Sequence, residues 1–95
     1  MKVLLFVLRF LIRRVKNVRL TEEEELLFEA LRGLRTEIAR EESVPPYIVF
    51  SDKTLVLMCR LRPENKAEML EVSGVGEHKF EKYGARFLQR IAEHV

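Results

Sequence analysis

The side chain best suited to chemistry in this sequence is a tyrosine that directly follows two prolines, in Val44-Pro45-Pro46-Tyr47. Proline fixes its own backbone angle and restricts the residue before it, so Tyr47 follows a stiff turn. An exposed aromatic face can stack on an unpaired nucleobase, which contributes roughly 1–3 kcal/mol per base with little sequence preference. Lys53 lies six residues further on and adds a positive charge. A second interpretation stays open, in which Tyr47 is half-buried and covers the core.

A second candidate site is the glycine-containing segment Gly74-Val75-Gly76, which leads toward Lys79 and Lys82. Glycine lets backbone amides come close to a phosphate, and the N-terminus of a following helix favours an anion. Glu77 lies in that first turn and opposes a phosphate there. A tight turn between two helices explains the same glycines without any ligand. The two glycines and two lysines are therefore candidate nucleic-acid contacts, with a purely structural turn as the alternative.

No catalytic constellation is present. His78 and His94 have no acidic or cysteine partner at metal-ligand spacing, so both are expected to be solvated helix residues. The chain lacks a glycine-rich phosphate loop with its lysine and serine or threonine, which argues against nucleotide hydrolysis. Cys59 has no neighbouring base and is expected to be a small core residue. We therefore expect no catalytic residue, metal, cofactor or small-molecule substrate.

The longest predicted helix begins at Thr21, which has capping-box spacing to Glu24, and runs to about Glu42, before Pro45 and Pro46. Apolar residues recur in it at steps of 4, 3 and 4, which marks one buried face, whereas the arginines fall on other faces. The apolar positions are Leu27, Leu31, Leu34 and Ile38, and the arginines are Arg32 and Arg35.

Three further helices are expected after the proline turn, in which Ile48, Val49 and Phe50 are expected to anchor the core. Each new helix has a recognisable start signal or stop residue. The first starts at Ser51 or Asp52, carries Leu55, Met58 and Cys59 and stops at Pro63; the second runs from Asn65 to about Val72; the last starts near Glu77, with Phe80, Tyr83, Phe87 or Leu88, and Ile91 on its apolar face. Gly84 inside the last helix indicates close helix–helix contact or simple tolerance.

Length and charge divide the chain into two parts. Its 95 residues, 47% of them hydrophobic, fit one small domain. Residues 1–20 contain six lysines and arginines and no acid, a net charge of +6, while residues 21–95 hold the other 11 basic and all 15 acidic residues, a net charge of −4. We expect a basic apolar N-terminal segment over 1–20. Residues 21–95 are expected to form an all-α domain, a compact bundle of about five short helices.

The N-terminal segment carries an apolar run at residues 3–12. The run is shorter than the roughly 20 residues of a membrane span, and Arg9 interrupts it. A signal peptide would need a small-residue cleavage site, which is missing. Packing on the domain or on a neighbour is favoured over an interfacial helix, so membrane contact is not expected. A single cysteine is compatible with the expected cytoplasmic location.

The order and spacing of these motifs resemble the helicase-and-ribonuclease-D C-terminal (HRDC) domain family, with the RecQ-helicase version as the closest match. The resemblance covers about residues 27–91, most of the chain. It rests on Leu31-Arg32 with Leu34-Arg35, residues 44–52, Thr54-Leu55, Met69-Leu70, residues 73–76 and residues 79–84. The apolar segment at 1–20 is no part of the family pattern.

The resemblance implies a compact helical, non-catalytic module of a RecQ-like DNA helicase, whose catalytic motifs lie elsewhere. In bacterial RecQ-like members a tyrosine after the double proline is implicated in binding single-stranded DNA, which makes Tyr47 the first candidate, with Lys53 and Lys66 flanking it. Because the body of this chain is acidic, we expect weak binding of single-stranded or partly duplex DNA. The alternative is a docking module that contacts the helicase core or another protein without binding DNA.

Overall fold

The computed structural model describes residues 19–94, so most of the predicted N-terminal segment lies outside the described residues. The elements are α2 (Glu22–Glu42), α3 (Pro46–Val49), α4 (Asp52–Leu61), α5 (Lys66–Leu70), α6 (Glu77–Lys79), the π-helical η1 (Phe80–Gly84) and α7 (Ala85–Glu93). The backbone stays helical from α6 through η1 into α7. Residues 19–94 therefore form an all-α bundle of five helices, as predicted. None of these helices is long and apolar enough to cross a membrane.

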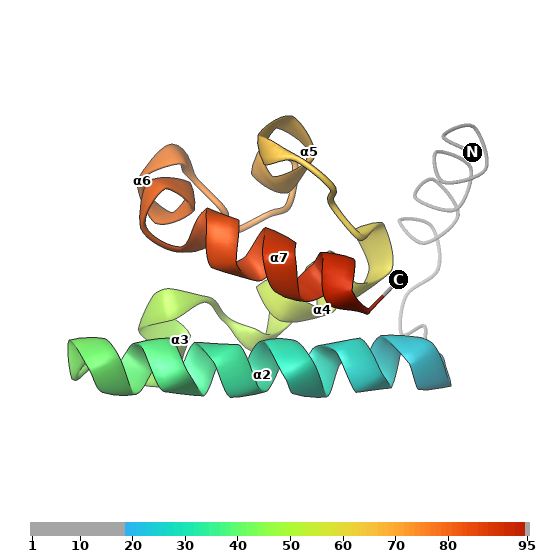
Figure 1. Ribbon diagram of the computed structural model, residues 1–95, viewed down its shortest axis with the longest axis horizontal. Helices are drawn as coiled ribbons and strands as arrows, with labels where there is room; N and C mark the ends of the chain where they lie inside the picture. Colours follow the sequence, from blue (N-terminus) through green and yellow to red (C-terminus); the bar gives the residue numbers. More distant parts are fainter. Residues whose placement is uncertain (1–18, 95) are drawn as a thin grey trace.

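The helix α2 runs along one side of the molecule, α3, α4 and α7 pack against it, and α5 and α6 lie further from it (Figure 1). It begins with the predicted capping box: the Thr21 hydroxyl accepts from the Glu24 amide at 3.1 Å, and the Glu24 carboxylate accepts from the Thr21 amide at 2.8 Å. It ends at Glu42, and its C-cap residue Ser43 adopts a left-handed backbone conformation with φ of 54°. The double proline follows, and the chain turns back over α2 as α3 and α4.

A single apolar core joins all five helices. Phe50, from the link between α3 and α4, is buried in it, with its ring edge-on to Tyr83 and Phe87 at centroid distances of 5.9 and 5.0 Å. The predicted core position of Cys59 is confirmed, since the residue is fully buried and burial raises the pKa of its thiol to about 12. Other fully or almost fully buried side chains are Leu27, Leu31, Leu34, Ile38, Val49, Leu55, Met58, Met69, Val72 and Ile91.

Two predictions of burial are wrong. Ile48 was expected in the core, but it is 44% exposed because residues 46–49 form a helical turn that buries Val49 and leaves Ile48 on the outer side. Arg35 was expected away from the buried face, yet only 8% of it is exposed. Its side chain reaches from α2 into the space beside Phe50, where it finds hydrogen-bond partners from another part of the chain.

The remaining helix starts follow the local signals. The Ser51 hydroxyl accepts from the Thr54 amide at 3.2 Å, so Ser51 caps α4 and Asp52 is its first residue. The Asn65 side chain caps α5 by accepting from the Glu68 amide at 2.9 Å. The helix α5 ends at Leu70, two residues before the predicted end.

The π-helical stretch η1 was not predicted, and it explains Gly84. A Cβ atom at Gly84 would lie 2.3 Å from Cδ2 of Phe80, which is in the same helix. The glycine therefore accommodates the Phe80 ring across one wide turn. Neither of the two predicted explanations, contact with another helix or simple tolerance, describes this position.

Candidate nucleic-acid interface

Tyr47 lies on the outer surface of α3, with 67% of the residue exposed. The turn that carries it is fixed at both ends: Pro45 and Pro46 restrict its start, and the Ile48 amide donates to the Pro45 carbonyl at 3.0 Å. The next two residues, Val49 and Phe50, are buried and anchor the turn. Of the two interpretations of Tyr47, the one in which it covers the core is therefore wrong.

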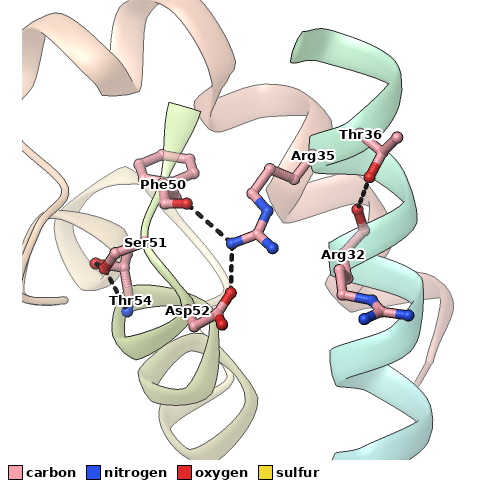
Figure 2. Close-up of polar contacts among 7 residues, drawn as sticks. All are labelled: Arg32, Arg35, Thr36, Phe50, Ser51, Asp52 and Thr54. Atoms are coloured by element: carbon pink, nitrogen blue, oxygen red, sulfur yellow. Dashed lines mark hydrogen bonds and ion pairs between the residues drawn. The ribbon is translucent and has the colours of Figure 1, made fainter. Parts of the chain in front are cut away.

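A buried arginine fixes the segment that follows Tyr47. Figure 2 shows the Arg35 side chain extending from α2 toward the start of α4. Its Nη1 donates to the Phe50 carbonyl at 3.1 Å and to Oδ1 of Asp52 at 2.7 Å. Because both partners lie within five residues of Tyr47, this pair of hydrogen bonds ties the position of Tyr47 to α2.

A polar groove runs along α2 beside α3, with a volume of about 460 Å³. Arg32, Thr36 and Arg40 follow one another at four-residue steps, so they share one side of the helix. The groove is lined by Glu29, Arg32, Arg35, Glu37 and Arg40 of α2 and by Pro46 of α3. We call it the α2 groove. Sequence reasoning did not single out Arg32 or Arg40 as site residues, although their spacing was a usable signal.

Lys53 is exposed in the first turn of α4. Among residues 19–94, the structure gives it no ion-pair partner. Its charge is therefore available, within the described part of the chain, to an anion that approaches the Tyr47 side.

Lys66, the other predicted flanking residue, is held by two glutamates. Its Nζ lies 3.2 Å from Oε2 of Glu77 and 3.3 Å from Oε1 of Glu81, and 5.4 Å from the ring centroid of Phe80. Hydrogen bonds to these two carboxylates raise the pKa of Lys66. The lysine stays charged, but its charge is compensated locally, and the pair of acids faces any approaching phosphate.

Lys82 is compensated in a similar way by the end of α2. Its Nζ donates to Oε1 of Glu42 at 3.4 Å, and the same carboxylate oxygen accepts from the Tyr83 hydroxyl at 2.7 Å. The hydrogen bonds with Tyr83 and Glu42 raise the pKa of Lys82. Burial raises the pKa of the Tyr83 hydroxyl, so this hydroxyl stays protonated and donates to Glu42.

Lys79 is the last residue of α6. It is half-buried, and its Nζ lies 5.7 Å from the ring centroid of Phe50. This contact connects α6 to the link that follows α3, so Lys79 is the predicted lysine of the α6–η1 region whose contact reaches toward the Tyr47 turn.

The glycine turn packs tightly against α4. Gly74 has φ of +96°, and a Cβ atom there would lie 2.1 Å from Oγ1 of Thr54. That same hydroxyl donates to the Ser73 carbonyl at 2.9 Å, which fixes the turn on α4. Gly76 precedes α6 and has open space around it. Packing alone thus requires glycine at Gly74, and a nucleic-acid contact at either glycine stays a prediction.

Residues 19–94 contain no group of three histidine, cysteine or acidic side chains arranged to hold a metal ion. His78 and His94 are both exposed, as expected from the sequence.

A comparison with known protein families matches residues 24–91 to the HRDC domain. The chain belongs to the HRDC family. This HRDC domain is 52% identical over 77 residues to the ATP-dependent DNA helicase RecQ of Bacillus subtilis, a stretch that covers 81% of this chain and 13% of the helicase. It is 36% identical over 81 residues to the ATP-dependent DNA helicase UvrD2 of Mycobacterium tuberculosis, which covers 85% of this chain and 11% of that helicase.

The comparison of structures agrees with the family. The solved D. radiodurans RecQ HRDC domain 3 superposes on this HRDC domain with a TM-score of 0.72 and 38% sequence identity, over 74% of this chain and 92% of that structure. The resemblance to RecQ-type HRDC domains that the sequence motifs indicated is therefore confirmed. The chain spans only 13% of the Bacillus helicase and 11% of UvrD2, so it corresponds to one small domain of those enzymes.

In this HRDC domain, the predicted site residues fall into two groups. Tyr47 and Lys53 lie on α3 and at the start of α4, next to the segment held by Arg35. The other group lies on α5, on the glycine turn and on α6–η1, where two of the three lysines are paired with glutamates. Its members are Lys66, Gly74, Gly76, Lys79 and Lys82.

Proposed function

We propose that this HRDC domain is a non-catalytic accessory domain of a RecQ-like DNA helicase and that it binds single-stranded or partly duplex DNA weakly, through Tyr47. The observation that carries the proposal is the 67% exposure of a tyrosine ring on a turn fixed by two prolines. A ring that is already held in place loses little conformational freedom when a base stacks on it. The RecQ and UvrD2 relatives are named as DNA helicases, which supports nucleic acid as the ligand.

Electrostatics set the expected strength of this binding. Residues 21–95 carry a net charge of −4, so no broad basic surface attracts DNA to the helical domain. The contributions that favour DNA binding are local: one aromatic face and the few cations that are not paired with neighbouring acids. We therefore propose modest affinity that decreases as salt is added. The expected cytoplasmic location belongs to this proposal, since a domain of a bacterial-type helicase would act where the DNA is.

The test compares three versions of the full 95-residue chain: wild type, Tyr47→Ala and Tyr47→Phe. Fluorescence anisotropy with a fluorescein-labelled oligothymidylate in low salt gives the dissociation constants. Tyr47→Ala should weaken binding by about 5- to 150-fold, the equivalent of 1–3 kcal/mol of stacking. Tyr47→Phe keeps the aromatic face and should bind nearly as well as wild type.

Both variants keep the basic segment 1–20, so a difference between them reports on position 47 alone. Because Tyr47 is exposed, the melting temperature should barely change in either variant. Equal affinity of wild type and Tyr47→Ala, with the fold intact, would rule out Tyr47 as the binding residue.

A second function, docking onto the helicase core or another protein, is favoured by a different part of α2. Its first turn carries Glu22, Glu23, Glu24 and Glu25, and the next residue, Leu26, is 68% exposed. An apolar side chain beside an acidic cluster suits a partner with basic and apolar residues. This function predicts that Leu26→Asp abolishes capture of a RecQ helicase core in a pull-down while oligothymidylate binding is unchanged.

A further inference from the structure

The α2 groove extends along α2 and includes Pro46, the residue next to Tyr47. Arg32 and Arg40 are eight residues apart on one side of the helix, which places them about 12 Å apart along its axis at 1.5 Å per residue. Pro46 lines the groove and immediately precedes Tyr47. A chain of anionic groups lying along the groove would therefore reach the exposed aromatic ring at one end.

The arginines of the α2 groove differ in how firmly they are held. Arg40 has no ion-pair partner among residues 19–94, and it is exposed. Within the described residues, the ion-pair partner of Arg32 is Glu29 at 3.1 Å, where the two side chains are 56% and 62% exposed. Exposed pairs of this kind contribute little free energy, so a phosphate can replace the carboxylate as the partner of Arg32. Lys66 differs because it lies between two glutamates, and Lys82 differs because its partner Glu42 is only 33% exposed.

Arg35 has a different role in the same groove. Its guanidinium is committed to the Phe50 carbonyl and the Asp52 carboxylate, and Figure 2 shows Arg32 lying apart from this contact on α2. Arg35 is therefore a positioning residue that sets the distance between the groove and the turn that carries Tyr47.

We propose that the α2 groove holds the sugar–phosphate backbone of the strand whose base stacks on Tyr47, with Arg40 and Arg32 on separate phosphates. This proposal rests on the proposed function and adds the path of the strand. Arginine suits the task because its planar guanidinium can donate two parallel hydrogen bonds to one phosphate. At 3.4 Å per nucleotide of a B-form strand, 12 Å spans roughly three to four nucleotides, and fewer in a more extended strand. Glu29 and Glu37 line the same groove and keep the affinity modest.

The test replaces the two groove arginines in the full chain, as Arg32→Gln together with Arg40→Gln. The matched control removes two positive charges from α5 and η1, as Lys66→Gln together with Lys82→Gln. Anisotropy titrations with labelled oligothymidylate are run at several salt concentrations. The groove variant should lose roughly tenfold in affinity, as expected for two charge-assisted contacts at an exposed site. Its plot of log affinity against log salt should flatten by about 1.4, since each lost single-strand phosphate contact removes about 0.7.

The control variant should keep both the affinity and the salt slope of wild type. Both variants should stay folded, because all four replaced side chains are exposed. Circular dichroism melts check this. A groove variant that binds as well as wild type, while Tyr47→Ala binds weakly, overturns the path of the strand and leaves the proposed function standing. A larger loss in the lysine variant than in the groove variant also overturns it. If wild type itself does not bind oligothymidylate, the proposed function fails, and the path of the strand fails with it.

Discussion

The two sides of this domain carry cations of very different availability. Arg40 in the α2 groove and Lys53 at the start of α4 have no ion-pair partner among residues 19–94. On the α5–η1 side, Lys66 and Lys82 each lie within 3.4 Å of a glutamate. Counting positive residues in a segment therefore does not locate an anion site, because neighbours brought in by the fold decide how much of each charge is left.

The proline turn and the glycine turn also differ in what they leave exposed. The proline turn buries Val49 and Phe50 and leaves the Tyr47 ring outside, whereas the glycine turn presses its own backbone against Thr54. One turn presents a side chain, and the other packs its backbone against α4. Rigidity alone does not make a turn a binding site, since both turns are rigid.

The largest effect is expected from Gly74→Ala, which tests whether the glycine turn is structural. The substitution forces alanine into φ of +96° and places its Cβ 2.1 Å from Oγ1 of Thr54. Combining backbone strain with overpacking, we expect a loss of roughly 2–4 kcal/mol in the free energy of unfolding. Urea denaturation followed by circular dichroism measures this loss.

Gly76→Ala is the matched control, since no atom lies within 4 Å of the added Cβ. It should change the free energy of unfolding by no more than about 0.5 kcal/mol. If the two variants are equally stable, the distinction between a packing turn and a presenting turn is wrong.

A smaller effect is expected from Arg35→Ala, which tests how the groove side is held. The variant leaves the buried Phe50 carbonyl without this donor and removes the ion pair with Asp52. Hydrogen bonds of a charged group contribute about 1.5–3 kcal/mol, so we expect the domain to be destabilised by about 2 kcal/mol. Arg32→Ala removes only an exposed pair on the next turn of α2 and should cost well under 1 kcal/mol. Equal losses for the two arginines would contradict the assignment of Arg35 as the positioning residue.

The smallest effect is expected from removing the two glutamate partners of Lys66, which tests whether this pairing limits DNA binding. Glu77→Gln with Glu81→Gln removes both partners of Lys66 and should raise the affinity for oligothymidylate by roughly two- to fivefold, the scale of an exposed ion pair. Glu22→Gln with Glu25→Gln removes the same amount of charge from the first turn of α2 and serves as the control. Anisotropy at fixed low salt compares the two. The same gain in both variants would show that net charge, and not the pairing of Lys66, limits binding on the α5–η1 side.

Local sequence signals predicted the helix starts well. Thr21, Ser51 and Asn65 cap their helices through side-chain contacts to the amide three residues on, a relation that is visible within four letters of sequence. The end of α2 at Glu42 was also predicted, since proline cannot continue a helix. These features depend on neighbours in the chain and not on the fold.

The errors arose where distant segments decide the outcome. Arg35 is buried because its partners lie 15 and 17 residues away, and Lys82 is compensated by Glu42 from 40 residues away. The exposure of Ile48 depends on a four-residue helix too short to show a period. The position of Tyr47 could be predicted from the prolines, but its exposure and the groove beside it could not, because both depend on how α3 lies against α2.

The burial of Cys59 has a consequence for measuring the motions of this domain. It is the only cysteine of the chain, it is fully buried, and its thiol has a pKa of about 12, so almost no reactive thiolate exists in the folded state at neutral pH. An alkylating reagent can then modify the protein only when the core opens. The rate of alkylation of Cys59 in native buffer reports on these opening events without denaturant, and the same measurement on a DNA complex shows whether binding slows them.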